Sequence, residues 1–123
     1  MTTVTVVPGQ THIVAPGQTE IGDIVLAGGT LDVPLGATIS NTFVAGLDNV
    51  FLGTAIGTTV VGGGIEDVEG GFASGTTISA LGQQFVGAGG TAFDTTVGSG
   101  GIQTLLDATA SGTVVSAEGH RVR

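Results

Sequence analysis

The chain has 123 residues, a formal net charge of −8 at neutral pH, 24 glycines and no cysteine. Its only lysine or arginine residues are Arg121 and Arg123, so it carries no basic patch for nucleic acid or anionic lipid. The absence of cysteine excludes disulfides, thiolate nucleophiles and cysteine-ligated zinc. The length predicts one domain over residues 1–123, either whole or as a piece of a longer rod.

A repeat runs through the whole chain. Seven eight-residue windows contain a β-type run, at 3–10, 21–28, 40–47, 57–64, 75–82, 94–101 and 111–118. Their fourth residues are large and apolar and lie 17 to 19 positions apart: Val6, Ile24, Phe43, Val60, Ile78, Val97 and Val114. A second apolar series keeps the same spacing: Val14, Val33, Val50, Val68, Val86, Leu105 and Val122. Two independent series with one period indicate stacked structural repeats.

Each repeat unit contains short β-type runs separated by glycine-rich turns, which leaves no room for a helix. One such coil cannot bury its own apolar face, whereas stacked coils bury a continuous core. The sequence therefore predicts an all-β fold, a β-solenoid (parallel β-helix) of about seven coils.

Side-chain direction follows from strand alternation. Both apolar series are expected to point inward, so that Val60 stacks on Phe43 and beneath Ile78. The residues that flank the first series are then expected to point outward, as a ladder of threonine on one side and of valine on the other. From these ladders we predict a self-association surface: Thr5, Val7, Val25, Thr42, Val44, Thr59, Val61, Thr77, Thr96, Thr113 and Val115.

The chemistry-bearing residues are few. A carboxylate run, Glu66, Asp67 and Glu69, could in principle supply an acid and a base for glycoside cleavage, but with no nearby cation we expect a solvated edge. The other acids are expected to be dispersed: Asp23, Asp32, Asp48, Asp94 and Asp107. His12 and His120 fall at equivalent repeat positions and are expected on the surface. No catalytic, cofactor or metal site is predicted. A calcium nonapeptide repeat is absent, and bound calcium is left open.

The segment 62–106 resembles the AIDA-type repeat of bacterial autotransporter adhesin passenger domains. It repeats a GG turn, a strand with a central valine (Val68, Val86), a second GG turn and a TT run before Ile78 and Val97. The resemblance implies a right-handed parallel β-helix that forms a surface-exposed, often self-associating stalk. It also implies an extracellular or cell-surface location, although residues 1–10 do not form a signal peptide.

These observations favour a structural, non-catalytic module of an adhesin-like protein that associates with itself end to end or laterally. A host surface or a glycan is a possible further partner, whereas nucleic acid binding and membrane insertion are not expected. Two alternatives remain: a carbohydrate-active β-helix enzyme, which needs a groove with two carboxylates and a cation, and an ice- or surface-binding solenoid that uses regular threonine ladders.

Overall fold

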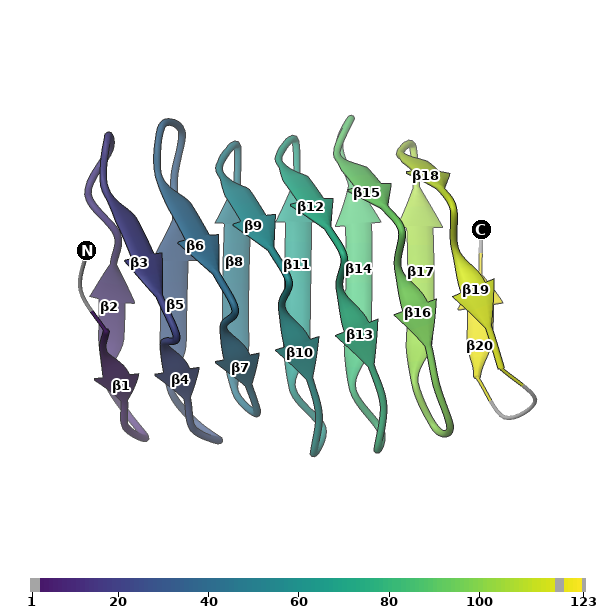
Figure 1. The fold of residues 1–123 in the computed structure, drawn as a ribbon, viewed down its shortest axis with the longest axis horizontal. Helices are drawn as coiled ribbons and strands as arrows, with labels where there is room; N and C mark the ends of the chain where they lie inside the picture. Colours follow the sequence, from purple (N-terminus) through teal and green to yellow (C-terminus); the bar gives the residue numbers. More distant parts are fainter. Residues whose placement is uncertain (1–2, 117–118, 123) are drawn as a thin grey trace.

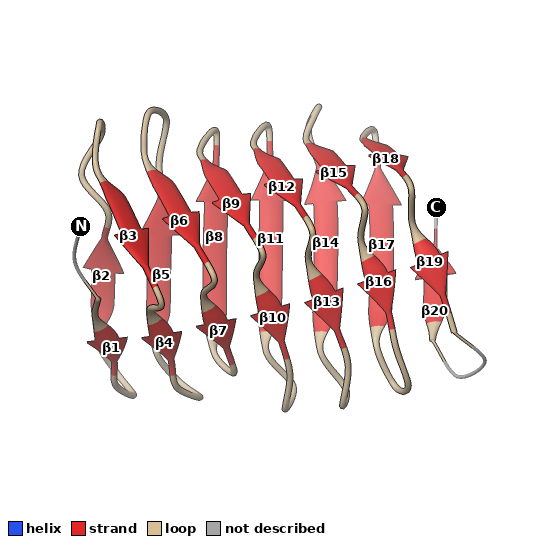
Figure 2. Ribbon diagram, in the orientation of Figure 1, coloured by secondary structure: helices blue, strands red, loops and turns tan. Residues whose placement is uncertain are grey.

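The computed structural model describes residues 3–116 and 119–122, and the regular elements in these ranges are all strands (Figure 2). Figure 1 shows the path of the chain: strands run downward along the front and upward along the back while the chain advances from left to right. This winding is right-handed. No helix among the described residues is long and apolar enough to cross a membrane.

Three parallel sheets form the walls, and each is named here after its first strand. The β1 sheet contains β1 (Thr5–Val6), β4 (Ile24–Val25), β7 (Phe43–Val44), β10 (Thr59–Val60), β13 (Thr77–Ile78), β16 (Thr96–Val97) and β19 (Val114–Val115). The β2 sheet contains β2 (Thr11–Ile13), β5 (Thr30–Val33), β8 (Leu47–Phe51), β11 (Ile65–Glu69), β14 (Gln83–Gly87), β17 (Ile102–Leu106) and β20 (His120–Val122). The β3 sheet contains β3 (Thr19–Ile21), β6 (Thr38–Ser40), β9 (Thr54–Ile56), β12 (Phe72–Ser74), β15 (Thr91–Phe93) and β18 (Thr109–Ser111).

Every coil takes one strand from each sheet, so coil 1 is β1 to β3 and coil 4 is β10 to β12. Six coils are complete, and β19 and β20 begin a seventh. Each strand pairs in parallel with the corresponding strand of the next coil, as Val68 does with Val50 and Val86. The predicted parallel β-solenoid and its period of about 18 residues are confirmed.

The second predicted core series is correct over the coils where its side chains are described. These residues are almost completely buried: Val14, Val33, Val50, Val68, Val86 and Leu105. At the C-terminal end the register departs from the prediction, because Val122 pairs with Thr104 rather than with Leu105.

The first predicted series is wrong at three positions. Ile24 and Phe43 are 39% and 42% exposed, and Val114 is 62% exposed. The residues that follow them take the core positions, which are Val6, Val25, Val44, Val60, Ile78, Val97 and Val115. Val60 therefore stacks between Val44 and Ile78. At Phe43 the reason is volume, because the narrow, densely packed core accepts valine in successive coils and the larger phenyl ring is placed on the open face.

This shift changes the predicted self-association surface, because neighbouring residues in a strand point to opposite faces. Val25 and Val44 are fully buried and Thr42 is 1% exposed, so these three cannot belong to a surface. Thr113 is half-buried and donates a hydrogen bond from its hydroxyl to Gln103, 3.3 Å away. Val115 is a core-column residue that is 41% exposed in the last coil. The remaining residues do reach solvent, fully or in part: Thr5, Val7, Thr59, Val61, Thr77 and Thr96.

Candidate functional site

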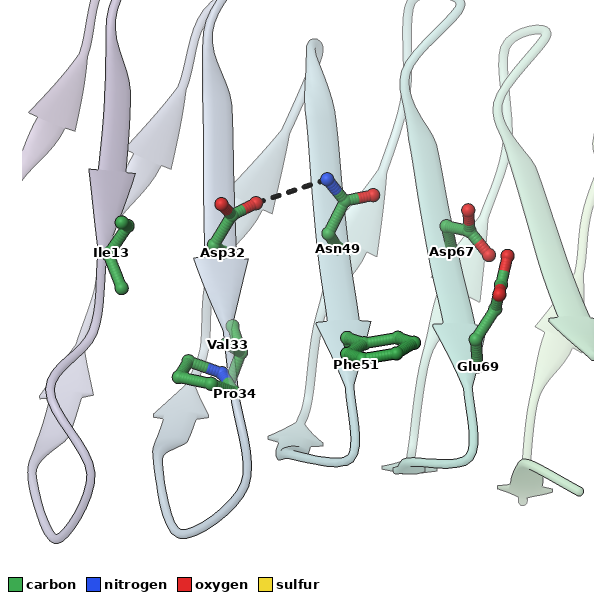
Figure 3. A pocket seen from close by; sticks show the side chains of 8 residues that line it. All are labelled: Ile13, Asp32, Val33, Pro34, Asn49, Phe51, Asp67 and Glu69. Carbon is green, nitrogen blue, oxygen red and sulfur yellow. Dashed lines mark hydrogen bonds between the residues drawn. The ribbon is translucent and has the colours of Figure 1, made fainter. Parts of the chain in front are cut away.

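The outer face of the β2 sheet carries a groove of about 450 Å³ that crosses the first four coils (Figure 3). Two columns of side chains line it, because outward positions alternate with the buried ones in each strand. One column is Ile13, Asp32, Asn49 and Asp67. The second is Pro34, Phe51 and Glu69, beside the backbone of Val33.

The groove combines an apolar platform with hydrogen-bond acceptors. The Phe51 side chain is 58% exposed, and the Asn49 amide donates to the Asp32 carboxylate over 3.1 Å. Partial burial, followed by the charge of Glu69, raises the pKa of Asp67 to about 6. The described lining residues include three carboxylic acids and no lysine or arginine. Such a surface can accept hydrogen bonds from a ligand while an apolar ligand face rests on the phenyl ring.

The predicted solvated edge is therefore correct only in part. Asp67 and Glu69 lie in the groove, but Glu66 is fully buried on the opposite face of β11. Asp23 and Asp48, expected among the dispersed surface acids, are also fully buried. These three carboxyl groups belong to polar columns that run inside the solenoid.

The main interior column lies on the inner face of the β2 sheet. Its register positions, coil by coil, are His12, Leu31, Asp48, Glu66, Gln84, Gln103 and Arg121. The amide of Gln103 donates to Gln84 over 2.7 Å, and the amide of Gln84 donates to Glu66 over 2.9 Å. These bonds form a buried ladder along the solenoid axis.

Threonines that precede the β1-sheet strands complete the ladder. Thr76 donates to the Glu66 carboxylate over 2.9 Å, and Thr95 donates to the Gln84 carbonyl oxygen over 3.3 Å. Thr113 repeats this contact with Gln103. Each hydroxyl reaches back to the preceding coil, so buried polar groups in the C-terminal half are paired in a repeating pattern.

Desolvation dominates the electrostatics of the column. Burial, followed by the charge of Glu66, raises the pKa of Asp48 well above its usual range. Burial also raises the pKa of Glu66, although hydrogen bonds from Gln84 and Thr76 oppose this effect. Both side chains therefore favour the protonated state far more than an exposed carboxyl group does.

The two histidines do not occupy equivalent positions, contrary to the prediction. His12 is a half-buried member of the interior column, and its Nε2 atom lies 2.9 Å from the Glu20 carboxylate. His120 pairs in register with Ile102, which belongs to a different column. Near this N-terminal pair, burial and then the Glu20 carboxyl group raise the pKa of Asp23 to about 6.

The sequence contained a signal for the interior column. Residues two apart in a strand share a face, and four polar residues lie two positions before the second core series: Asp48, Glu66, Gln84 and Gln103. Polarity alone directed Asp48 and Glu66 to the surface in the prediction. These side chains can be buried because each is hydrogen-bonded to a polar side chain of a neighbouring coil or lies opposite one in the register.

No protein-family model and no curated protein match the chain. Among solved structures, it is similar to a crystal structure of a TibA fragment that is hyper-glycosylated in a reaction catalysed by TibC. The TM-score is 0.85 and the sequence identity is 30%, with 98% of this chain and 53% of that one covered. The chain thus spans about half the length of that fragment of an AIDA-type autotransporter adhesin. Its fold and its repeats agree with the resemblance seen in segment 62–106, and the chain is a right-handed parallel β-solenoid whose repeats resemble the AIDA type.

Proposed function

We propose that the chain is a structural, non-catalytic module of an adhesin-like protein at a bacterial surface or in the extracellular space. The observation that carries this proposal is the likeness to the TibA fragment over 98% of the chain. A rigid stack of parallel coils suits this role, because every strand of an internal coil is held on both sides.

The enzymatic alternative receives less support. An enzyme of this kind requires a groove with two carboxylates and a cation. The groove on the β2 sheet supplies the carboxylates, but none of its described lining residues is a lysine or an arginine. The ice-binding alternative is also weakened, because Ile24 and Phe43 interrupt the outward threonine column between Thr5 and Thr59.

The groove is the proposed contact site for a host surface or a glycan. Beads coated with the chain are expected to adhere to cultured epithelial cells, and Phe51→Ala is expected to reduce adherence severalfold by removing the apolar platform. Phe93→Ala is a matched control, because Phe93 is 44% exposed on the β3 sheet. Equal loss with both variants would assign adherence to another surface. Adherence no greater than that of uncoated beads would refute the adhesive role itself.

Self-association is the second part of the proposal, and the β1 sheet offers a surface for it. Ile24 and Phe43 are cross-strand neighbours on its outer face. Leu26 and Val7 lie in the next outward column of the same face, where they are 38% and 45% exposed. An exposed apolar cluster of this kind favours contact between protein surfaces.

We expect sedimentation velocity to show oligomers that grow with protein concentration and that Phe43→Ser weakens about tenfold in Kd. Phe72→Ser on the β3 sheet serves as the control, since Phe72 has a comparable exposure of 40%. A monomer that persists at high micromolar concentration would argue against self-association. Association unaffected by Phe43→Ser would place the contact elsewhere.

A further inference from the structure

The C-terminal end of the groove brings two carboxyl groups together on the outer face of β11. Asp67 and Glu69 are two positions apart in this strand, so they share a face, and Figure 3 shows their carboxyl groups directed toward each other. Burial, followed by the charge of Glu69 and a hydrogen bond with it, raises the pKa of Asp67 to about 6. Above that pH, two carboxylates lie side by side where the described lining residues of the groove offer no lysine or arginine.

Two phenyl rings flank this acid pair. Phe51 is the register partner of Glu69 in the preceding coil, and its side chain is 58% exposed. Phe85 is the register partner of Asp67 in the following coil. The Phe85 ring leans over Gly87, because its Cε2 atom lies 2.9 Å from the point that a Cβ atom on Gly87 would occupy. Gly87 is itself the register partner of Glu69, so aromatic rings lie on both sides of the Glu69 side chain.

The spacing of these rings suits a cation. Neighbouring strands of a sheet are about 4.8 Å apart, so β8 and β14, which carry the two rings, are separated by about 10 Å with β11 between them. A cation held midway would lie within about 6 Å of both rings, which is the range of a cation–π contact. The carboxylates of β11 would supply the opposite charge.

We propose that this end of the groove binds an arginine side chain of a partner protein, held between Phe51 and Phe85 and against the carboxylates of Asp67 and Glu69. The proposal rests on the function proposed for the groove and specifies what the groove recognises. The formal net charge of −8 would also attract a basic partner from a distance.

Arginine fits this set of groups better than other cations or a sugar. Its guanidinium group is planar, so it can stack on aromatic rings, and its several N–H donors can reach two carboxylates at once. A lysine ammonium is compact and strongly hydrated, and it has no flat face for the rings. A quaternary ammonium group has no N–H to donate, and a neutral sugar would leave the negative charges of the acid pair unbalanced.

NMR titration of the full ¹⁵N-labelled chain at pH 7.5 tests the site with Nα-acetyl-arginine amide as the probe. We expect saturable shifts around Phe51, Glu69 and Phe85 with a Kd of about 1 mM, as one cation–π and ion-pair contact permits. Nα-acetyl-lysine amide is expected to bind about fivefold more weakly. Tetramethylammonium and N-acetylglucosamine should cause no saturable shift, and equal or tighter binding of either one would overturn the proposal.

Two substitutions of outward-facing side chains test the named contacts. Glu69→Gln and Phe51→Ala are each expected to weaken binding of the arginine probe about fivefold. Asp94→Asn is the matched control, because it removes the same charge from an exposed turn after β15, where asparagine tolerates the φ of 56°. Equal weakening by Asp94→Asn and Glu69→Gln would mean that net charge alone attracts the probe, which would contradict a built site.

The affinity is also expected to fall about tenfold between pH 7.5 and pH 5, because protonation of Asp67 removes one of the two charges. The residues that face Asp67 are Glu69 on its own strand, Asn49 on β8 and Phe85 on β14, so the acid pair alone titrates here. Asp67→Asn, which stays neutral, should bind the probe more weakly and with a flatter pH profile. An affinity that is the same at both pH values would argue against the acid pair as the contact.

Failure of this inference can be told from failure of the adhesive role. Beads that adhere to cells through Phe51, together with a chain that does not bind the arginine probe, would overturn the inference and leave the groove as a contact site. Binding of the probe by a chain whose beads do not adhere would support arginine recognition and refute only the adhesive role.

Discussion

Gly82→Ala is expected to lower the free energy of unfolding by about 3 kcal/mol, because the new methyl group has no space. A Cβ atom at Gly82 would lie 2.5 Å from the Val60 carbonyl oxygen and 3.0 Å from that of Ser79. Those atoms belong to the backbone of the preceding coil and of the turn, so relief requires separating two coils. Urea unfolding followed by circular dichroism measures the loss.

Gly98→Ala is the matched control for this steric effect. A methyl group at Gly98 would have its nearest neighbouring atom 3.3 Å away, and Val61 and Ser79 occupy the equivalent position in the two preceding coils. We expect a change within about 0.5 kcal/mol for this variant. Similar losses for the two variants would mean that general loss of glycine, and not the close approach of coils, determines stability.

The free energy of unfolding is expected to fall as pH rises from 5 to 8. Burial raises the pKa values of Asp48 and Glu66 in the folded state above their usual values of 3.8 and 4.5. The unfolded chain therefore releases these protons first, and the stability that they contribute is lost as pH rises toward the folded-state pKa values. Each group contributes a loss of about 1.4 kcal/mol for every unit by which its pKa is raised.

Urea midpoints at pH 5, 6, 7 and 8 measure this dependence and avoid the isoelectric region near 4.1. Asp48→Asn combined with Glu66→Gln is expected to flatten the profile and to raise stability most at pH 8, because both amides remain neutral. Asp23 and Asp67, whose pKa values are each raised to about 6, would leave a smaller residual slope. A profile that rises with pH would contradict the raised pKa values.

Part of the core register could have been found in the sequence with one further rule. A glycine follows the inward residue of the β1 sheet by four positions in five coils, which pairs Val25 with Gly29, Val60 with Gly64, Ile78 with Gly82, Val97 with Gly101 and Val115 with Gly119. The spacing identifies Val115 rather than Val114, but it does not separate Val25 from Ile24, because Gly28 follows Ile24 by four positions. It fails in coil 1, where Gln10 follows Val6 by four positions. It also fails in coil 3, because the turn after Val44 is shorter and Gly46 takes the equivalent place.

The groove could be predicted less well than the core. Strand alternation places Asp67 outward from β11, as the sequence indicated. Alignment of Asp67 with Asn49 and Asp32 requires the register of three successive coils, whose lengths vary by one or two residues. That register cannot be read directly from the sequence.

The sequence by itself determined the period, the all-β solenoid and the second core series, because stacked coils must repeat their apolar residues at one spacing. Only the tertiary structure decided which of two adjacent apolar residues points inward, since a one-residue slip exchanges the faces of a strand and hydrophobicity cannot separate Phe43 from Val44. Only the tertiary structure, too, showed that Glu66 is buried. A polar side chain can be buried only if the next coil supplies a partner, and that partner is fixed by stacking, not by neighbours along the chain.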